Sequence, residues 1–289
     1  MAMSKIFEVN DLSFKYPRSN EDTIKSISFS VEQGTIFGLL GPSGAGKSTT
    51  QKILTKLLGG YSGTITYLGK DLSSYGKSFY ENIGVGFEMP VHFGKLTALE
   101  NLRYFAGLYQ KTGDYESLLK QVGLYDARNQ MVGDYSKGMK IRLNFVRALL
   151  NDPDVLFLDE PTNGLDPKNA KIIKDMILDL KKNGKTIFIS THLMGDVEQL
   201  CDQVVFITKG RLSEISSPRE LKMRYGKKEV YVEYVRDNER IKETFPLEAI
   251  GKDQKFLALI KANNIETIHS GETSMEDIFI KVTGEAKYE

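Results

Sequence analysis

The sequence of 289 residues contains a single cysteine, Cys201, and three histidines that lie far apart, His92, His192 and His269. One cysteine can form no internal disulfide, and histidines without paired cysteines do not make a zinc site. The sequence also has no apolar run approaching the ~18 residues that cross a bilayer. We therefore expect a chain that inserts into no membrane and suits a reducing compartment, with Cys201 as a small buried residue of a short helix.

An excess of charge of one sign is missing as well, because 39 Lys and Arg residues balance 38 Asp and Glu residues and leave a net charge of +1. No basic field is therefore available to draw the whole chain to nucleic acid or to an anionic membrane. Hydrophobic residues make up 40% of the chain, and together with 26 glycines this is the composition of an ordinary globular protein. We expect a folded chain with no nucleic-acid partner.

Segments with strand character alternate with helical segments over most of the chain, which is typical of a parallel sheet built from strand–helix–strand units. Continuous apolar runs at 35–40 and 155–158 predict strands that are covered on both faces. The alternating pattern of residues 5–35 predicts an antiparallel β subdomain near the N-terminus. Apolar residues at helical spacing predict a helical insert at about 91–151. The fold class is therefore α/β.

The pattern of the sequence changes in the last quarter of the chain. A strand at 230–235, a helix at about 255–262, another strand and a final helix at 274–282 predict a small, separate α+β unit. We therefore predict a main domain at 4–227 and a small C-terminal domain at 228–289.

The strongest chemical signal is a run that matches the pattern G-x-x-x-x-G-K-[ST], made of Gly41, Pro42, Ser43, Gly44, Ala45, Gly46, Lys47, Ser48 and Thr49. It stands between an apolar strand and a helix predicted at about 47–58, the setting in which successive backbone N–H groups and a helix N-terminus enclose a phosphate. Lys47 is placed to reach the β- and γ-phosphates, and the Ser48 hydroxyl is placed to bind Mg²⁺. A chance glycine-rich turn is the alternative interpretation.

Two carboxylates, Asp159 and Glu160, follow the second apolar run, and Pro161 ends the strand. In open α/β sheets, ligands bind at this carboxyl end of the strands. Asp159 is suited to bind Mg²⁺, and Glu160 is suited to deprotonate a water that attacks a γ-phosphate. An acidic loop start is the alternative, but together with the glycine-rich run the pair predicts a P-loop NTPase core that binds ATP and Mg²⁺. Lys47 and Glu160 are then catalytic residues.

The segment 135–139, Tyr-Ser-Lys-Gly-Met, opens a predicted helix. It resembles the signature motif of the ABC ATPases, whose common form is Leu-Ser-Gly-Gly-Gln, and it matches that form at Ser136 and Gly138. Residues 163–167, Asn-Gly-Leu-Asp-Pro, resemble the D-loop of the same family. The motifs stand in the order of the family, and the resemblance covers about residues 4–224.

Two single residues extend the resemblance. His192, after the predicted strand at 186–190, resembles the switch histidine that keeps the γ-phosphate and the attacking water in register, and Tyr16 resembles the aromatic residue that stacks on adenine. Position alone leaves simpler interpretations open. His192 could be a capping or core histidine at a strand end, Tyr16 could be a half-buried strand residue, and Ser136 could be only a helix N-cap.

The family resemblance implies a head-to-tail dimer with two ATP molecules between the protomers. Lys47, Ser48 and Asp159 of one chain would hold ATP and Mg²⁺, while Ser136 and Gly138 of the other chain would close on the γ-phosphate. It also implies polytopic membrane permease chains as partners. The protein would then be cytoplasmic and peripheral on the inner face of the cell membrane.

One position departs from the family, whose Q-loop normally carries glutamine. Aligning Ile83–Phe87 as the preceding strand puts Glu88 at that position, as a third Mg²⁺ ligand or as a solvated strand-end carboxylate. Glu88, the signature at 135–139 and the ending Ser-Met-Glu-Asp-Ile-Phe at 274–279 resemble the branch of multidrug, lantibiotic and polysaccharide exporters. We therefore predict the ATP-hydrolysing subunit of an exporter.

Three alternatives stay open on the sequence. A non-transport ABC ATPase of DNA repair or of the ribosome would carry long coiled coils, zinc cysteines or two ATPase units, which the sequence does not show. An importer subunit would use the same chemistry, and a substrate-binding protein encoded nearby would favour it. A P-loop nucleotide kinase would transfer phosphate to a second nucleotide.

Overall fold

The computed structural model describes residues 4–284 except 90, 237–238, 262–264 and 272, so the last residues of the predicted C-terminal domain lie outside the described part. The chain divides into two compact units, Met1–Ser217 and Pro218–Glu289. The division falls before helix α7 (Pro218–Tyr225), whereas the sequence placed the boundary between 227 and 228. The difference arises because α7 packs against helix α9 (Met275–Thr283) within the second unit.

A six-stranded sheet with the strand order β10-β9-β3-β8-β7-β6 forms the middle of the first unit. Five strands run parallel, namely β3 (Ile36–Leu40), β6 (Ile83–Gly86), β7 (Val155–Asp159), β8 (Thr186–Thr191) and β9 (Gln203–Thr208). The predicted parallel sheet is thereby confirmed. Strand β10 (Arg211–Ser216), which the sequence analysis missed, pairs antiparallel with β9 at one edge.

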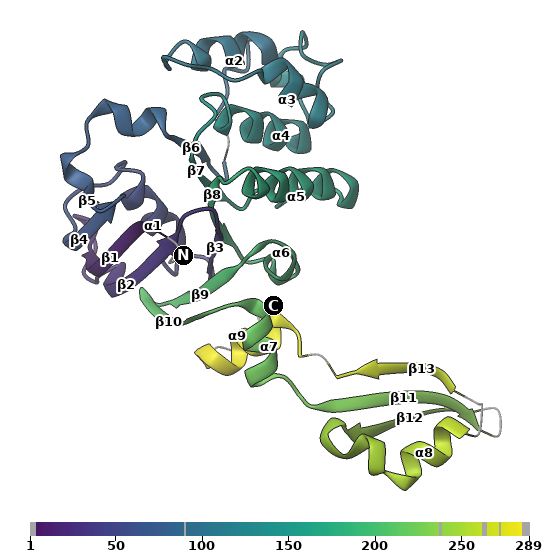
Figure 1. Ribbon diagram of the computed structural model, residues 1–289. Coiled ribbons are helices and arrows are strands. Elements are labelled where there is room, and N and C mark those ends of the chain that lie inside the picture. Colours follow the sequence, from purple (N-terminus) through teal and green to yellow (C-terminus); the bar gives the residue numbers. More distant parts are fainter. Residues whose placement is uncertain (1–3, 90, 237–238, 262–264, 272, 285–289) are drawn as a thin grey trace. The chain divides into compact units, whose positions relative to one another are not determined.

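The central strands are apolar throughout because both of their faces are covered. In β7, Val155 and Phe157 belong to one core cluster, while Leu156 and Leu158 belong to a second cluster. Successive side chains of a strand point to opposite faces, so this alternation assigns the two clusters to the two sides of the sheet. Figure 1 shows α1 (Lys47–Leu54) on one side of the sheet and helices α5 (Pro167–Lys182) and α6 (Met194–Leu200) on the other.

The first side is closed by the predicted antiparallel subdomain, a four-stranded sheet with the order β2-β1-β4-β5. Its strands are β1 (Lys5–Phe14), β2 (Ile24–Glu32), β4 (Ser62–Tyr67) and β5 (Lys70–Asp71). Phe7 of β1 is fully buried and meets the rings of Phe157 and Phe188 edge-on, at centroid distances of 5.9 and 5.4 Å. This aromatic contact fixes the subdomain against the parallel strands.

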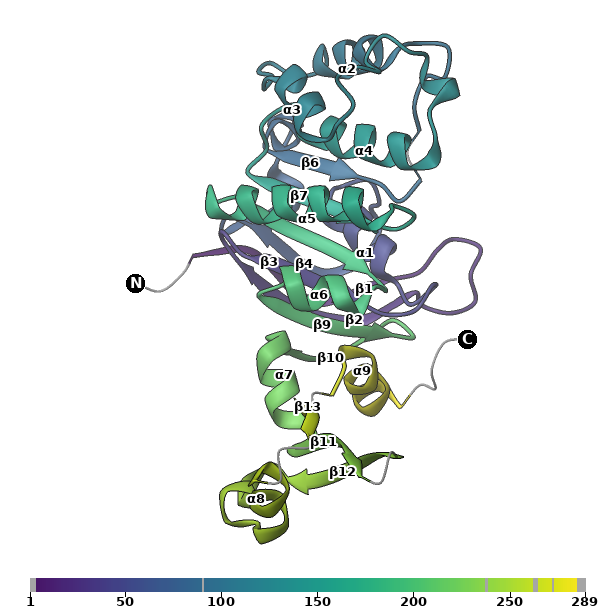
Figure 2. The ribbon, with the colours of Figure 1, turned by 90° about the vertical axis from the view of Figure 1, so that its right-hand side faces the viewer.

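The opposite side carries α5 (Pro167–Lys182) and α6 (Met194–Leu200), which face the viewer in Figure 2. Asp166 caps α5 through its carboxylate, and Pro167 takes the first helical position, where its missing N–H costs nothing. Helix α1 ends at Leu54 rather than at the expected Leu58. The cause is Lys56, whose φ of 58° takes the chain out of the helical conformation.

The helical insert holds α2 (Ala98–Ala106), α3 (Tyr115–Gln121) and α4 (Lys137–Ala148), next to the β6 edge of the sheet (Figure 1). Side chains cap all three helices at their N-termini, from Thr97, Asp114 and Ser136 respectively. Short 3₁₀ turns lie at Leu72–Ser74, Lys77–Glu81 and Val132–Asp134 in this unit and at Leu247–Lys252 in the second.

The second unit is the predicted α+β unit, with a three-stranded antiparallel sheet of the order β12-β11-β13. Its elements are β11 (Glu229–Arg236), β12 (Glu239–Pro246), α8 (Gln254–Lys261) and β13 (Ile265–Ser270), together with α7 and α9. A separate core forms from Val230, Val232, Tyr234, Phe245 and Phe256. Strand β12 was not predicted from the sequence, because Phe245 is its only buried residue and the rest of the strand lacks an apolar pattern.

Candidate active site

The glycine-rich run forms the loop between β3 and α1, at the carboxyl end of the parallel sheet. Gly46 takes a φ of +115°, and a Cβ there would come within 2.7 Å of the Ile24 side chain. A Cβ at Gly41 would lie 2.1 Å from the carbonyl oxygen of Ile207. Both positions therefore require glycine, and the loop can turn tightly into the helix only because it has them.

The N-terminus of α1 opens toward this loop. Gly46 is the N-cap residue and offers no side-chain hydrogen bond to the first turn. The backbone N–H groups of Lys47, Ser48 and Thr49 are therefore available to an anion, as the first N–H groups of a helix are when no side chain caps them. The geometry fits the phosphate site that the sequence predicted.

The Lys47 side chain is buried inside the loop. Its Nζ donates a hydrogen bond to the carbonyl oxygen of Gly41 at 2.6 Å, and its residue is 8% exposed. Burial lowers the pKa of Lys47, while the negative charges of Glu160, Asp159 and Glu88 act in the opposite direction. The cation therefore lies within electrostatic reach of all three predicted carboxylates.

Ser48 and Asp159 lie together, as expected from their motifs. The Ser48 hydroxyl donates to Oδ2 of Asp159 at 2.8 Å. Two oxygen atoms this close together suit Mg²⁺ as ligands. In proteins Mg²⁺ binds one or two carboxylates and completes its coordination shell with phosphates and water. Among the described residues no group of three or more His, Cys, Asp or Glu side chains could form a metal site without such additional ligands.

The structure adds partners for Asp159 that sequence reasoning missed. The parallel register of β7 and β8 sets Asp159 beside Ser190, whose hydroxyl donates to Oδ1 of Asp159. Gln51 of α1 in turn donates to the Ser190 hydroxyl at 3.1 Å. The signal in the sequence for this contact was a hydroxyl residue, Ser190, at the carboxyl end of an apolar strand. Its partner could not be predicted, because the partner depends on the register between β7 and β8.

Glu160 is 6% exposed, and its carboxylate accepts two side-chain hydrogen bonds. Thr191 Oγ1 donates to Oε2 at 2.9 Å, and Nδ1 of His192 lies 2.8 Å from Oε1. The structure therefore brings Glu160 and His192 together, although 32 residues separate them in the chain. Thr191 was not anticipated. The backbone of Glu160 has a φ of 51°, in the left-handed region, and its N–H continues the sheet by donating to the Ser190 carbonyl oxygen.

Tyr16 lies beside the phosphate loop, with its hydroxyl 3.2 Å from Oγ1 of Thr49. Its ring packs edge-on against Phe14 at 4.9 Å. The residue stands in the loop that follows β1, and not in a strand as the alternative interpretation has it. The half-buried character of the alternative interpretation is observed, and so is the proximity to the loop.

Ser136 and Gly138 make their contacts within the helical insert and its neighbour, the segment 163–167. The exposed Ser136 caps α4, since its Oγ accepts a hydrogen bond from the Met139 N–H at 3.2 Å. A Cβ at Gly138 would lie 3.5 Å from the Leu165 side chain. The helix-cap interpretation of Ser136 is therefore correct as far as one chain goes, and its exposure leaves room for a second role.

Glu88 follows β6 and is exposed. Its charge acts to raise the pKa of Lys47, but less than the charges of Glu160 and Asp159 do. Cys201 follows α6 instead of lying within the helix, and it is partly buried and not fully buried as expected. Burial raises the pKa of its thiol, and its Sγ packs against the core, 2.8 Å from where a Cβ at Gly38 would lie.

None of the described helices is both long and apolar enough to cross a membrane. A family model described as "ABC transporter" matches residues 24–163, and one described as "Fluoroquinolone efflux ABC transporter C-terminal domain" matches residues 228–272. The second match begins where the sequence analysis placed the C-terminal domain.

Two relatives align over nearly their whole length. A fluoroquinolones export ATP-binding protein of Mycobacterium tuberculosis is 48% identical over 283 residues, which cover 97% of this chain and 94% of the relative. A bacitracin transport ATP-binding protein of Bacillus licheniformis is 34% identical over 307 residues, with 98% of each chain covered. Export and transport proteins therefore stand among the relatives, as the sequence analysis predicted.

Solved structures agree with this assignment. The structure of an ATP-binding subunit of an ABC transporter superposes with a TM-score of 0.69 at 30% identity, over 76% of this chain and 93% of that one. The phosphate loop, the two carboxylates at the end of β7 and the similarity to the relatives lead to one conclusion. The chain belongs to the ATP-binding subunits of ABC transporters, a family of nucleotide-binding ATPases.

Proposed function

We propose that this protein binds ATP with Mg²⁺ at residues 41–49, hydrolyses it to ADP and phosphate, and couples the reaction to export through partner membrane chains. The observation that carries the proposal is a pair of side-chain hydrogen bonds at one end of the sheet. Ser48 is hydrogen-bonded to Asp159, and His192 is hydrogen-bonded to Glu160. Buried Lys47 is within electrostatic reach of both carboxylates.

Lys47, Ser48 and Asp159 bind the phosphates in this proposal. Lys47 neutralises charge at the β- and γ-phosphates, and the N–H groups of the α1 N-terminus donate to their oxygens. Ser48 and Asp159 would hold Mg²⁺, which neutralises charge on the transferred phosphoryl group when bound. Most of the acceleration then comes from fixed charges and donors that need no rearrangement during the reaction.

Glu160 is the general base, and it takes the proton of the water that attacks the γ-phosphate. In the structure its Oε1 is hydrogen-bonded to His192, whose side chain is 52% exposed. Oε1 has a second lone pair that can accept from a water, and the exposed His192 can turn aside to widen the access of that water. His192 then keeps the γ-phosphate and the water in register, as the family resemblance implies.

The second half of the site comes from another protomer, the same chain or a related one, in a head-to-tail dimer. Ser136 and Gly138 stand at the N-terminus of α4, a helix of 12 residues whose first N–H groups suit an anion. Ser136 is exposed, so it is accessible to the γ-phosphate held by a partner chain. Tyr16, beside Thr49, is placed to stack on the adenine ring.

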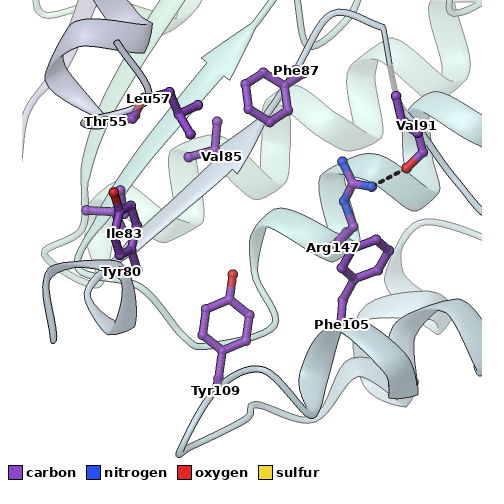
Figure 3. Close-up of a pocket in the computed structure, with 10 residues that line it drawn as sticks. All are labelled: Thr55, Leu57, Tyr80, Ile83, Val85, Phe87, Val91, Phe105, Tyr109 and Arg147. Atoms are coloured by element: carbon purple, nitrogen blue, oxygen red, sulfur yellow. Dashed lines mark hydrogen bonds between the residues drawn. The ribbon is translucent and has the colours of Figure 1, made fainter. Parts of the chain in front are cut away.

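A pocket beside Glu88 offers a docking surface for the permease. It encloses about 410 Å³ and is lined by Thr55, Leu57, Tyr80, Ile83, Val85, Phe87, Val91, Phe105, Tyr109 and Arg147 (Figure 3). Arg147 is fixed there by the carbonyl oxygen of Val91 and by the ring of Phe105, 4.8 Å from its guanidinium. Leu57 and Val91 at its margin are 52% and 78% exposed, so an apolar helix end of a membrane partner has a surface to cover.

Two features support export as the direction of transport. The relatives that cover the whole chain are named for fluoroquinolone export and bacitracin transport. The C-terminal unit matches a domain described for fluoroquinolone efflux. On this proposal the protein is cytoplasmic and reaches the inner face of the membrane through its permease.

The proposal is tested by measuring ATP hydrolysis of the purified protein with and without Mg²⁺. Lys47→Ala should abolish hydrolysis, because no other described cation is buried in the phosphate loop. Lys52→Ala is the matched control, since Lys52 lies exposed on the same helix and should be dispensable. Equal rates of the two variants would refute the assignment of the loop.

A further inference from the structure

We propose that Thr191 is a positioning residue for ATP hydrolysis. Its hydroxyl holds one carboxylate oxygen of Glu160 permanently, while His192 holds the other oxygen exchangeably. The inference rests on the proposed function, in which Glu160 accepts the proton of the attacking water. Thr191 touches neither water nor phosphate in this account and acts only through Glu160.

The hydrogen bonds of Thr191 have a fixed direction. Its Oγ1 lies 3.0 Å from the Leu193 backbone nitrogen and 2.9 Å from Oε2 of Glu160. The Leu193 N–H can only donate, so it takes up a lone pair of the hydroxyl oxygen. The one hydroxyl proton is therefore directed to the carboxylate. A donor that is fixed in this way orients Oε2 more strictly than a freely rotating hydroxyl would.

Burial separates the two partners of Glu160. Thr191 is the last residue of β8 and is 1% exposed, so packing and the sheet hold its position. The His192 side chain is 52% exposed, against 5% for that of Glu160. An exposed imidazole can turn away without leaving a cavity, whereas a buried strand residue cannot. Turning of His192 thus opens the space at Oε1 to a water, while Thr191 keeps Oε2 in place.

The backbone of Glu160 does not supply this orientation by itself. Its N–H is bound to the Ser190 carbonyl oxygen at 2.8 Å, which fixes the Cα but leaves the rotatable bonds of the side chain undetermined. The neighbouring carboxylate shows the same arrangement, because Ser190 donates to Asp159. The end of β8 thus provides one hydroxyl for each of the two carboxylates at the end of β7. Hydrogen bonds to a carboxylate are stronger than those between neutral groups, so each one can hold its partner.

The test compares Thr191→Val, which keeps the shape and removes the hydroxyl, with Thr191→Ser, which keeps the hydroxyl. Thr186→Val is the matched control. Thr186 is buried at the other end of β8, and its hydroxyl accepts a hydrogen bond from the Gly34 N–H at 2.9 Å. It therefore reports the loss of a buried threonine hydroxyl on the same strand, away from the carboxylates.

We expect kcat of Thr191→Val to fall about 10- to 100-fold, the loss that follows removal of a hydrogen bond to a charged group. KM for ATP and the dissociation constant of a fluorescent ATP analogue should stay within about twofold, because the binding residues are untouched. Thr191→Ser should recover kcat to within about threefold of the wild type, and Thr186→Val should match the wild type. A second readout is independent of turnover: hydrogen exchange at the Leu193 amide should accelerate in Thr191→Val and stay slow in Thr191→Ser.

Equal kcat values for Thr191→Val and Thr186→Val would overturn the inference. So would a parallel loss of kcat and nucleotide affinity, which indicates a structural role only. If Thr191→Val does not fold, Thr191→Ala removes the same hydroxyl and is judged by the same criteria. Failure of the proposed function looks different, because the wild type itself would then not hydrolyse ATP, or Glu160→Gln would hydrolyse it at the wild-type rate.

Discussion

The phosphate-loop half and the signature half of the proposed nucleotide site differ in what one chain provides. In the first half, Lys47, Asp159 and Glu160 have partners within the same chain, and Lys47 and Glu160 are buried. In the second half, Ser136 is exposed, and its hydroxyl accepts a hydrogen bond from Met139 of its own helix. A buried charge is costly unless it is paired within the folded chain, whereas an exposed helix N-terminus can stay solvated until an anion binds. The first half is therefore preorganised within one chain, and on the proposed function the second half acts on another protomer.

The largest effect should come from the preorganised half. Glu160→Gln keeps the shape of the side chain and loses the general base, so turnover should fall by ~10²–10⁴ with ATP binding intact. Steady-state hydrolysis and nucleotide titration measure both quantities. Asp196→Asn controls for loss of a carboxylate near His192, because Asp196 bonds to Lys174 and Thr162 and not to the predicted site. A Glu160→Gln enzyme as fast as that control would show that the buried half lacks a base.

The second effect concerns the edge of the phosphate-loop half. Tyr16→Ala should weaken nucleotide binding by ~1–3 kcal/mol, the range of base–aromatic stacking, which is about 5- to 150-fold in affinity. ATP and GTP should suffer alike, because stacking tolerates either base. Tyr16→Phe is the matched control, which keeps the ring and removes the contact to Thr49. The chain has no tryptophan, so a fluorescent nucleotide must report binding. An unchanged dissociation constant in Tyr16→Ala would show that Tyr16 has only a structural role.

A smaller effect is expected at Glu88, which is exposed although its charge reaches Lys47. If Glu88 faces Mg²⁺, Glu88→Gln should weaken Mg²⁺ binding by about threefold, because a neutral oxygen ligand binds Mg²⁺ less tightly. Affinity for ATP should hold or rise, since one negative charge near the γ-phosphate is gone. Glu88→Ala should lower turnover further, and more so for hydrolysis stimulated through the permease. Mg²⁺ titrations of the hydrolysis rate that coincide for all three proteins would leave Ser48 and Asp159 as the metal residues.

The smallest effect concerns the insert that carries the signature half. Burial, together with the charge of Arg147, lowers the pKa of His92 to about 4, from an ordinary value near 6.5. Below pH 6.5 the unfolded chain takes up a proton at His92 while the folded chain does not, so stability should fall from pH 6.5 down to about 4. Thermal unfolding of His92→Gln should depend less on pH in that window. His269→Gln, at an exposed histidine, should keep the wild-type dependence, and identical curves for both variants would contradict the burial of His92.

The sequence predicted those parts of the fold and site that depend on neighbouring residues. The glycine-rich loop needs its glycines at fixed spacing, and β7 needs apolar residues on both faces, so each is visible in a few residues. Partners of the carboxylates are different. The hydroxyls of Ser190 and Thr191 contact the two carboxylates only because of the register between β7 and β8. Thr191 and Glu160, for example, are 31 residues apart in the chain.

Two other misses have the same kind of cause. Strand β12 has no apolar pattern of its own, because it is an edge strand with one buried residue and relies on pairing with β11. The end of α1 at Leu54 follows from the left-handed backbone of Lys56. Lysine rarely adopts this conformation, so its presence in the sequence does not predict a helix end. Pairing and backbone conformation of this sort are set by tertiary structure and not by local propensity.

The most direct test of the contrast between the two halves is the size of the Glu160→Gln protein in ATP and Mg²⁺, by size-exclusion chromatography with light scattering. We predict a dimer with twice the mass of the chain. Adding Ser136→Glu should abolish the dimer without weakening nucleotide binding, because the new charge meets the γ-phosphate of the partner chain. Gln121→Glu, an exposed charge elsewhere on the same insert, should leave the dimer intact. A Glu160→Gln protein that stays monomeric with ATP bound, or a dimer that survives Ser136→Glu, would contradict the account.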